Sequence, residues 1–467
     1  MPSTSVNNQN SSLDVLVLAA GLGTRMKSNL AKVLHKLDSR PLIAHVCRTA
    51  ADLKPNRILV VVGHQASEVQ VAVEQELGKD QASFVYQAEQ RGTGDAVLSA
   101  RDALAGAGST VLILSGDVPM VRGETLRSLI VEHNNKDSSC TILTIRLENP
   151  TGYGRIVRDE ARNFLRITEQ KDASEEERKI REVNSGIYCF DSAKLLKALS
   201  QVRPANSQGE YYLTDVPSIL QSEGERVGLY HHQDAREVSG VNTRAELAEF
   251  ENLLRRGTIR RLMLEDGVTF IDPSHTYVSS QAKIGRDCVI HPDVHIEGNC
   301  VIGEACELHQ GSRIVNSRLG ARVTVKDHCV ILDSEIADDC AIGPFAHLRM
   351  NAHIQESAVV GNFVEVKKST LGRGSKSMHL TYLGDATIGD KTNIGAGTVT
   401  CNYDGKQKHP TVIEDNVKIG SDTMLVAPVR VGHGSVTGAG SVVIEDVPPN
   451  SLVVGAPAKV KKKLTND

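Results

Sequence analysis

The chain has 467 residues and a formal net charge of −4 at pH 7, with 24% charged residues, 3% aromatic residues and no tryptophan. This balance gives no bulk electrostatic reason to bind nucleic acid or a membrane surface, so we expect neither as a partner. The length is sufficient for two or three domains, each with a core of its own.

The first twelve residues, MPSTSVNNQNSS, are polar, and we expect residues 1–12 to be disordered. The apolar run at residues 13–20 is interrupted by Gly21 and is too short to span a membrane. No basic segment precedes it, as an export signal would require. We therefore expect a cytoplasmic protein.

Residues 13–242 are expected to form an α/β domain. Short apolar runs alternate there with segments of helical character, a pattern typical of a doubly wound sheet. Such sheets bind ligands beyond the carboxyl ends of their strands, so the loop after the first run is the place to look for a site. The apolar runs are residues 13–20, 57–62, 84–86, 111–114 and 141–145.

That loop, AAGLGTRM (residues 19–26), is rich in glycine. It has no Lys-Ser/Thr pair of a Walker A loop, and Met26 stands where a dinucleotide fingerprint needs its third glycine. By itself the loop could be no more than a tight strand-to-helix turn. Arg25 and Lys32 add two cations to the exposed backbone N–H groups, and this combination suits a triphosphate.

A helical segment follows the α/β domain. Residues 243–264 carry apolar side chains at helical spacing, and Thr243 and Glu246 can form a capping box. We interpret residues 243–266 as a helical linker to a separate domain at residues 267–467. The arginines of the linker alternate with glutamates, which is typical of a solvated face and not of a nucleic-acid surface.

From about residue 284 to 444, an aliphatic residue recurs at nearly every sixth position, beginning with Ile284, Ile290 and Ile296. A period of six fits neither a single helix nor an alternating strand. It predicts a parallel β-helix in which each coil has three short faces and the aliphatic side chains stack from coil to coil. Occasional five-residue steps are expected to be shortened corners.

Two longer disturbances of this period are interpreted as insertions, which on a regular scaffold commonly carry function. The first lies between Leu371 and Leu383, and the second between Val399 and Ile413.

Five of the nine cysteines lie four residues after one of the recurring aliphatic positions. Alanine, valine, serine or threonine fills that place in other repeats, so small buried thiols explain the pattern better than a metal cluster. These cysteines are Cys288, Cys300, Cys306, Cys329 and Cys340.

Motifs in both halves of the chain resemble known families. LAAGLGTRMKSNLAKVLH (residues 18–35) resembles the signature of sugar-nucleotide pyrophosphorylases. With the six-residue repeats, residues 13–445 resemble the bacterial family of bifunctional glucosamine-1-phosphate N-acetyltransferases/N-acetylglucosamine-1-phosphate uridylyltransferases. The further motifs, in that family's order, are QAEQRGTGDAV (87–97), SGDVPM (115–120), GYGRI (152–156), EQKDA (169–173), EVNSGIY (182–188), GEYYLTD (209–215) and GVN (240–242).

The resemblance implies two reactions. Glucosamine-1-phosphate is acetylated by acetyl-CoA, and the product then receives UMP from UTP, giving UDP-N-acetylglucosamine and pyrophosphate for cell-envelope synthesis. Acetyl-CoA and UTP would be the co-substrates and Mg²⁺ the cofactor. The resemblance also implies a left-handed β-helix and a homotrimer with acetyl-transfer sites between neighbouring subunits.

For uridylyl transfer, the resemblance implies that Arg25 and Lys32 contact phosphates as catalytic cations and that Asp117 and Asn242 bind the metal. The contacts that it implies for N-acetylglucosamine-1-phosphate are Gly154, Glu169, Asn184 and Asn242. The contacts that it implies for UTP are Leu18, Ala19, Ala20, Gly21, Gly23, Lys32, Gln87, Gly92 and Thr93.

For acetyl transfer, the resemblance assigns the general base to His379, since an imidazole can accept a proton at physiological pH. The implied contacts of glucosamine-1-phosphate are Arg349, Lys367, Tyr382 and Asn393. The implied contacts of acetyl-CoA are Ala396, Asn402, Tyr403, Lys408, Ser421 and Ala439.

The chain departs from the family pattern at three places. Ala31 stands before Lys32 where the family usually has proline, and we expect a modest effect at most. Met350-Asn351 follows Arg349 where the family typically has Pro-Gly, so the local turn is expected to differ. The basic tail at residues 459–463 could contact coenzyme A phosphates, although a solvated terminus is the simpler interpretation.

Two other functions remain open from the sequence. The solenoid could be an inert or regulatory platform on a pyrophosphorylase, but His379 and the motif CNYDG (residues 401–405) argue against this because a platform needs neither. The chain could also be a non-catalytic regulatory subunit. The presence of Arg25, Lys32 and Asp117 argues against that.

Overall fold

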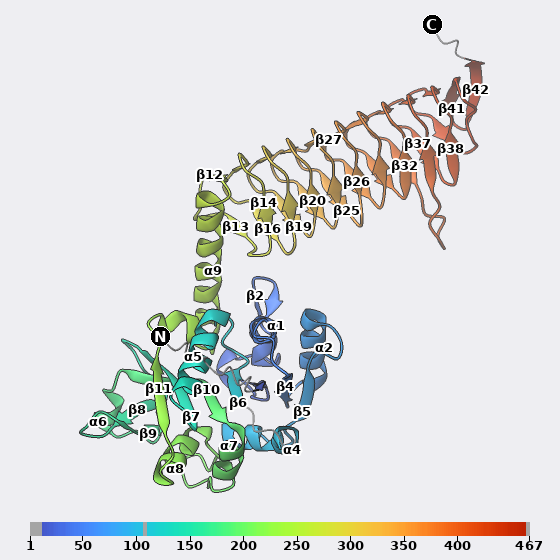
Figure 1. The fold of residues 1–467 in the computed structure, drawn as a ribbon. Coiled ribbons are helices and arrows are strands. Elements are labelled where there is room, and N and C mark those ends of the chain that lie inside the picture. Colours follow the sequence, from blue (N-terminus) through green and yellow to red (C-terminus); the bar gives the residue numbers. More distant parts are fainter. Residues whose placement is uncertain (1–11, 106–109, 464–467) are drawn as a thin grey trace, which may run out of the picture. The chain divides into compact units, whose positions relative to one another are not determined.

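The computed structural model describes residues 12–105 and 110–463, which form two compact units, Met1–Phe250 and Glu251–Asp467 (Figure 1). The disorder expected for the first twelve residues concerns a segment that, apart from Ser12, lies outside the described residues. None of the helices in the described ranges has the length and apolar character needed to cross a bilayer.

The first unit is built on a nine-stranded mixed sheet whose main path runs β11-β7-β10-β6-β1-β4-β5. β1 pairs in parallel with β4 and β6, whereas β10 is antiparallel to β6 and β7. The predicted α/β sheet is thus confirmed, with an antiparallel strand that the apolar pattern did not indicate. The strands are β1 Leu13–Leu18, β4 Arg57–Val62, β5 Ser83–Tyr86, β6 Thr110–Ser115, β7 Cys140–Arg146, β8 Arg155–Arg158, β9 Phe164–Thr168, β10 Glu182–Asp191 and β11 Val227–His231.

Both faces of this sheet are covered by helices. Side chains of a strand alternate between faces, so Val15 and Val17 of β1 lie in one apolar cluster and Leu16 lies in the other. The first cluster includes residues of α1 Leu42–Ala51, α2 Ala66–Leu77 and α5 Gly123–Asn135. The second includes residues of α3 Thr93–Ser99, α4 Arg101–Leu104, α7 Ser192–Leu199 and α8 Val216–Ser222.

The predicted helix after the α/β domain is present as α9, Arg244–Leu264. Its first turn has the expected capping box: the Glu246 backbone N–H donates to Thr243 Oγ1 (3.2 Å), and the Thr243 N–H donates to Glu246 Oε2 (2.8 Å). The last turns of α9 belong to the second unit, where Ile259 and Leu262 pack into the core of the β-helix.

The second unit is a parallel β-helix of three sheets, with 12, 10 and 9 strands in chain order, which we call the first, second and third sheets (Figure 1). Each strand pairs with the strand one coil further on, so that Ile284 lies against Ile302, and Ile302 against Leu319. The predicted stacking of aliphatic residues is confirmed. The strands that carry residues discussed below are β15 Val289–Ile290, β18 Glu307–Leu308, β25 His347–Arg349, β27 Val359–Asn362, β28 Glu365–Lys367, β30 Lys376–His379, β31 Tyr382–Gly384 and β33 Asn393–Ile394.

The five-residue steps are shortened corners, as expected, and they fall between the second and third sheets. At this corner the single residues Asn316 and Asp333 turn the chain with φ of 45° each. The coil that carries Arg349 has one more residue here, and Met350 and Asn351 take φ of 54° and 60°. Proline cannot adopt a positive φ, so this turn differs from a Pro-Gly turn.

The five cysteines at the repeat positions are buried free thiols inside the β-helix. Burial raises the pKa of Cys329 and of Cys340 to about 11, so both remain protonated at neutral pH. Thiolates bind metals and thiols do so poorly. The structure therefore supports the interpretation as small buried side chains.

The first of the two predicted insertions is wrong. Ser377 lies midway between Leu371 and Leu383 and pairs in register with Val360 on one side and Ile394 on the other. The coil therefore keeps its length, and a serine simply occupies an inward position that is aliphatic elsewhere. The sequence pattern broke because the residue type changed, not because residues were added.

The second predicted insertion is confirmed. Ile388 pairs with Ile413, which is 25 residues further along, whereas an ordinary coil takes seventeen or eighteen. Thr400 fills the inward position of the second sheet in this coil and is fully buried. The additional residues form the loop 402–410, between the second and third sheets.

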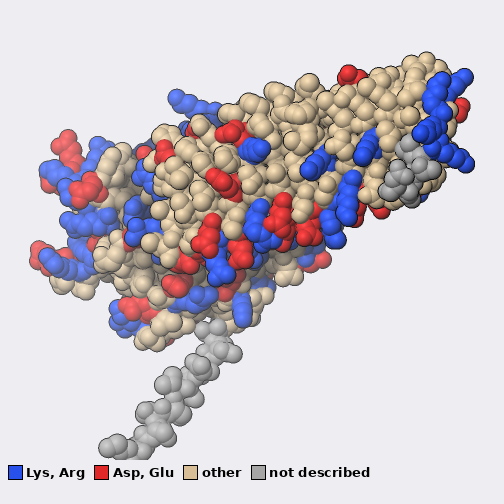
Figure 2. Space-filling view, turned by 90° about the horizontal axis from the view of Figure 1, so that it is seen from above, with Lys and Arg blue, Asp and Glu red and all other residues tan. Residues whose placement is uncertain are grey.

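The β-helix ends in an antiparallel pair. β41 Ser451–Gly455 continues the first sheet in parallel with β39 Val436–Thr437, and β42 Ala458–Lys463 folds back against β41. The lysines of the tail, residues 459–463, lie on β42 and are exposed. Basic side chains gather at this end of the solenoid, while acidic and basic side chains are mixed along its length (Figure 2).

We predict opposite effects for two serines that are both fully buried in the same coil. Ser377 Oγ has no hydrogen-bond partner among the described residues, whereas Ser375 Oγ donates to the Gly389 carbonyl (2.7 Å) and accepts from the Thr392 N–H (2.8 Å). Ser377→Ala should leave the stability unchanged or raise it by up to about 1 kcal/mol, and Ser375→Ala should lower it by about 1–2 kcal/mol.

The measurement is calorimetric unfolding of the full chain, following the transition of the β-helix. A loss of stability in Ser377→Ala as large as that in Ser375→Ala would show that the Ser377 hydroxyl has a partner.

Candidate active sites

The glycine-rich loop lies at the carboxyl end of β1 and borders a cavity of about 420 Å³. All of the residues expected to contact UTP line this cavity, together with Asp117. The neighbouring strands β4 and β6 run parallel to β1, so their carboxyl ends open on the same edge of the sheet. The expected UTP contacts along the wall are Leu18, Ala19, Ala20, Gly21, Gly23, Lys32, Gln87, Gly92 and Thr93.

Two of the glycines allow close approaches. Gly23 has φ of 63°, and a Cβ there would come within 2.4 Å of Lys32 Cβ, so the glycine lets Lys32 pack against the loop. Gly92 has φ of 110°, and a Cβ there would lie 2.5 Å from the Tyr211 carbonyl oxygen. Glycine is therefore required at both positions to shape the cavity.

A second cavity, of about 230 Å³, contains the residues expected to hold the sugar phosphate: Gly154, Glu169, Asn184 and Asn242. Leu18, Thr93, Ser115 and Asp117 border both cavities, which are therefore adjacent. A nucleotide in the first cavity and a sugar phosphate in the second would meet beside Asp117.

Four predicted residues form one polar network where the cavities meet. The Lys32 ammonium donates to Asp117 Oδ2 and to Asn242 Oδ1, the latter at 3.1 Å. The Arg25 guanidinium donates to the same Asn242 oxygen at 2.8 Å. The predicted cations and the predicted metal ligands, which are far apart in the sequence, are thus brought together.

This network shows that the Asp117 and Asn242 oxygens are placed to share one cation. Burial opposes ionisation of Asp117, but the adjacent Lys32 ammonium holds the pKa of this carboxyl below its ordinary value. The side chain is therefore a carboxylate at neutral pH. A carboxylate and an amide oxygen are hard donors of the kind that Mg²⁺ prefers, so the two residues fit a magnesium ion.

The second cavity contains a further carboxyl group, that of Glu169. Burial raises the pKa of Glu169, although Thr214 Oγ1 donates to this carboxyl at 3.2 Å. The Glu169 carboxyl lies close to Gly154: a Cβ at this glycine would be 2.8 Å from Ile167 and 3.3 Å from Glu169 Oε1. Asn184 is held by a hydrogen bond of 2.6 Å from its Nδ2 to the Tyr188 hydroxyl.

Sequence reasoning missed three residues of these sites. Gln87 Nε2 donates to Asp95 Oδ2 (2.8 Å), so Asp95 fixes the side chain expected to contact UTP. Thr214 and Tyr188 line the second cavity. Asp95, Thr214 and Tyr188 lie within the family-like motifs GTGD, GEYYLTD and EVNSGIY. The motifs could therefore have indicated these residues.

The departure at Ala31 has a visible local consequence. Ala31 has φ of −55°, which proline could also adopt, and its N–H donates to Gln65 Oε1 at 2.6 Å. A hydrogen bond to the Gln65 side chain therefore holds Ala31 in the position where the family usually has a proline ring. This agrees with the modest effect expected for the departure.

In the second unit, five residues form one row at the corner between the first and second sheets. Asn362 pairs with His379, and the register carries the same position on through the next coils. His379 Nδ1 lies 2.6 Å from Asn362 Oδ1. Because an amide oxygen can only accept, Nδ1 carries a proton, and in the neutral imidazole the lone pair is therefore on Nε2. The corner row consists of Asn362, His379, Ala396, Ser421 and Ala439.

Three expected phosphate and sugar contacts lie on the second sheet. Arg349 pairs with Lys367 one coil on, and Tyr382 lies on the next strand, β31. Lys367 is almost fully buried, and its Nζ donates to Asp385 Oδ2 at 2.9 Å. Asn402 of the inserted loop donates to the same oxygen at 2.6 Å.

The inserted loop places the ammonium group of Lys408 next to Lys367. The Lys367 ammonium lies beside Lys408 and lowers its pKa. Arg349, Lys367 and Lys408 thus lie close together, with Glu365 paired to Arg349 and Asp385 paired to Lys367. This places Lys408 and Asn402 beside the expected substrate contacts, whereas the expected acetyl-CoA contacts Ala396, Ser421 and Ala439 lie in the corner row.

The expected acetyl-transfer residues therefore divide between two sheets. His379, Asn393, Ala396, Ser421 and Ala439 lie on the first sheet or its corner, and the remaining contacts lie on the second sheet and its loop. Tyr403 is 60% exposed on that loop, and its hydroxyl donates to the Gly405 carbonyl (2.8 Å). A cavity of about 490 Å³ beside the inserted loop contains Lys408 and none of the residues of the first-sheet group.

Models of three families match the chain. Residues 15–183 match the MobA-like NTP transferase domain, residues 273–370 match the GMPPB C-terminal domain, and residues 410–445 match the bacterial transferase hexapeptide of six repeats. A solved structure of UDP-glucose pyrophosphorylase complexed with UDP-glucose covers 52% of this chain and 98% of its own, with 17% identity and a TM-score of 0.43. That similarity is too weak to bear on function.

Relatives that match almost the whole length decide the family. The bifunctional protein GlmU of Heliobacterium modesticaldum is 48% identical over 94% of each chain. GlmU of Geobacter metallireducens is 48% identical over 96% of this chain and 97% of its own. This chain belongs to the GlmU family of bifunctional proteins. Because such relatives cover both units, the GlmU match does not favour a platform role for the β-helix.

Proposed function

We propose that the two cavities of the first unit carry uridylyl transfer and that the corner row of the second unit carries acetyl transfer. The chain is a bifunctional enzyme. It acetylates glucosamine-1-phosphate with acetyl-CoA and transfers UMP from UTP to N-acetylglucosamine-1-phosphate, forming UDP-N-acetylglucosamine and pyrophosphate. The convergence of Arg25, Lys32, Asp117 and Asn242 where the cavities meet is the observation that carries the first assignment.

In uridylyl transfer, an oxygen of the sugar phosphate attacks the α-phosphorus of UTP and the bond to pyrophosphate breaks. The glycine-rich loop presents backbone N–H groups to the phosphates, and Lys32 and Arg25 offset the charge that grows on them. The second cavity orients the attacking sugar phosphate, with Glu169 and Asn184 at its polar wall.

We propose Mg²⁺ as the metal, held by Asp117 and Asn242. When bound, it supplies positive charge to the phosphate oxygens. Lys32 and Arg25 both donate hydrogen bonds to Asn242, one of the proposed ligands. Their cationic groups therefore lie within reach of phosphates bound beside Asn242.

In acetyl transfer, Nε2 of His379 accepts a proton from the amine of glucosamine-1-phosphate. The amine nitrogen attacks the thioester carbonyl, the C–S bond breaks and coenzyme A leaves as its thiol after protonation. Asn362 holds the imidazole with Nε2 unprotonated. The basic cluster of Arg349, Lys367 and Lys408 suits the substrate phosphate.

We further propose that the enzyme is a homotrimer in which neighbouring subunits complete the acetyl-transfer site. The residues of that site divide between two sheets of one chain, as described above. Next to the corner row lies an exposed apolar row, with Phe345 48%, Phe363 55% and Leu380 64% exposed. The two phenylalanine rings stack at 5.2 Å. A second copy packed on this row would lie beside His379.

The cytoplasm remains the proposed location. All nine cysteines are free thiols, which suits a reducing compartment.

The two activities are expected to separate by mutation. Asp117→Ala should lower uridylyl transfer by about 10²-fold or more and leave acetyl transfer unchanged. His379→Ala should lower acetyl transfer by about 10²–10⁴-fold and leave uridylyl transfer unchanged. The measurement is mass spectrometry of the products from each half-reaction with Mg²⁺ present. Loss of both activities in either variant would contradict separate sites.

Asn362 is expected to act as a positioning residue for His379. Asn362→Ala should lower kcat for acetyl transfer by roughly tenfold with little change in KM, because the unprotonated Nε2 is no longer favoured. In Asn362→Asp, the acid limb of the pH–rate profile should move to higher pH, because a carboxylate stabilises the imidazolium form.

The decisive comparison for Asn362 is a double-mutant cycle. If Asn362 acts through His379, the variant that combines Asn362→Ala with His379→Ala is no slower than His379→Ala alone. Additive losses would refute the positioning role.

The shared acetyl-transfer site is tested by complementation. His379→Ala and Arg349→Ala chains, each inactive alone, should regain acetyl transfer when they are co-expressed as mixed oligomers, because some sites then combine intact residues from different chains. As a control, Arg349→Ala mixed with Lys367→Ala should stay inactive, since these residues lie in one row of the same chain. Equal inactivity of both mixtures would mean that each site belongs to one chain.

A further inference from the structure

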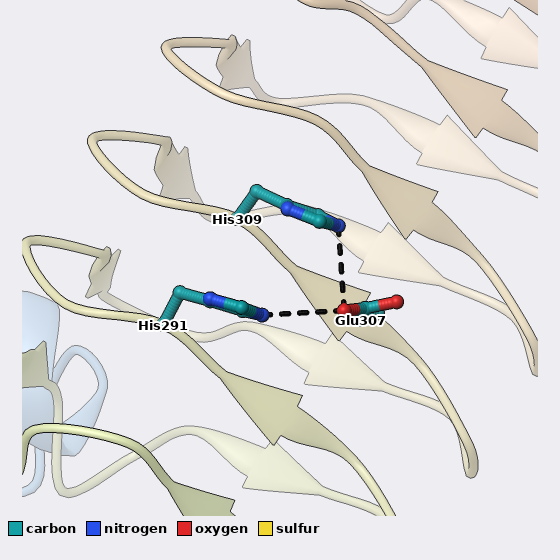
Figure 3. A group of neighbouring side chains, drawn as sticks. All are labelled: His291, Glu307 and His309. Carbon is teal, nitrogen blue, oxygen red and sulfur yellow. Dashed lines mark hydrogen bonds and ion pairs between the residues drawn. The ribbon is translucent and has the colours of Figure 1, made fainter.

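Two histidines and a glutamate form a group near the start of the β-helix, in neither cavity of the first unit and away from the corner row (Figure 3). Ile290 pairs with Leu308, so His291 and His309, the next residues, occupy the same position on consecutive coils. Glu307 precedes Leu308 on β18. It lies on the outward face with His309, because side chains alternate along a strand.

The donor atoms of this group converge. His291 Nε2 lies 3.2 Å from Glu307 Oε1, and His309 Nε2 lies 3.5 Å from the same oxygen. The imidazole rings stack at 4.7 Å with 9° between their planes, so both side chains extend in the same direction toward the carboxylate (Figure 3). One ligand atom from each residue lies within 4.8 Å of the other two.

These separations suit a metal ion. Metal–ligand bonds of about 2.0–2.2 Å in a tetrahedral site place neighbouring ligand atoms roughly 3.3–3.6 Å apart. The two nitrogen–oxygen separations are already close to this value. The two imidazole nitrogens must approach each other, and they can do so by side-chain rotation because the histidine side chains are each 29% exposed and that of Glu307 is 47% exposed.

Charge favours the same conclusion. The ion pairs of the Glu307 carboxylate are with these two imidazoles, which are positive only when protonated. Asp117, by contrast, is paired with a permanent cation, Lys32. With both imidazoles neutral the group carries one negative charge, and in the tautomer with the proton on Nδ1 each ring offers its Nε2 lone pair to a divalent ion.

We propose that His291, Glu307 and His309 form a binding site for a divalent transition metal of the zinc class. Imidazole donors select zinc, cobalt, nickel or copper over magnesium and calcium, whose ligands are oxygens. Three protein ligands leave one position of a tetrahedral ion open to water. The ion joins two consecutive coils through His291 and His309 and therefore binds the folded chain selectively.

The test is titration of the full-length, untagged chain with Co²⁺ after removal of metals by a chelator, followed by visible absorption. The Asp117→Asn background removes the proposed magnesium ligand, so that one site is titrated. We expect saturation at one equivalent per chain, with the visible bands of nitrogen-coordinated cobalt. Competition with Zn²⁺ should abolish these bands, and Zn²⁺ should raise the unfolding temperature of the β-helix.

His291→Asn, His309→Asn and Glu307→Gln should each weaken binding by at least about tenfold, since the loss of even a residue that only supports a ligand costs that much. The matched control is His295→Asn, which alters a partly exposed histidine of the same coil that stacks on Tyr277. It should bind Co²⁺ like the parent chain. Retained acetyl transfer, measured in the Asp117-containing versions, establishes that the β-helix of each variant is folded.

Two outcomes would overturn the proposal. One is the absence of saturable cobalt binding in the parent chain. The other is binding that His291→Asn and Glu307→Gln leave unchanged, which would place the metal elsewhere and make the group a hydrogen-bonded ladder of side chains.

Discussion

Each strand of the β-helix pairs with the strand one coil further on, and this backbone register determines where every outward side chain lies. Because paired strands are about 4.8 Å apart, residues at equivalent positions form rows along the solenoid. The corner row of His379 and the pair of Arg349 and Lys367 are both products of this register. So is the alignment of His291 with His309. Differences in coil length are absorbed at the corners and in the inserted loop, so the rows persist through them.

The first unit obtains its site from a different constraint. Parallel strands present their carboxyl ends at one edge, and the loops there bring together residues from distant parts of the chain. Lys32 is the centre of this arrangement, because its ammonium contacts both Asp117 and Asn242. Its approach depends on Gly23, where any Cβ would collide with it. One glycine therefore helps to set the position of the proposed catalytic cation.

Much of the fold could be predicted because its signals are periodic. The six-residue repeat indicated the β-helix, and the apolar runs indicated five strands of the first sheet. The antiparallel strand β10 was not predicted, because its direction is set by pairing with β6 and β7 and not by its own apolar pattern. Ser377 was misread as part of an insertion because a residue count alone cannot distinguish a polar substitution from added residues.

The sites were predictable as residues but not as contacts. The motifs identified Lys32, Asp117 and Asn242, yet nothing in the sequence indicates that one ammonium joins the other two side chains. Lys408 is expected to contact acetyl-CoA, and nothing in the sequence indicates that the inserted loop also brings it beside Lys367. Loop conformation depends on tertiary contacts such as that of Asn402 with Asp385, which no local pattern encodes.

The antiparallel pair at the end of the β-helix has a consequence for association. A parallel solenoid presents unpaired backbone groups at its last coil, and such an edge is a template on which another chain can add strands. β42 covers the last strand of the first sheet and places exposed lysines, residues 459–463, along the new edge. Like charges on two such edges repel each other. At the end of the first sheet, β42 and its lysines therefore disfavour the addition of a further strand.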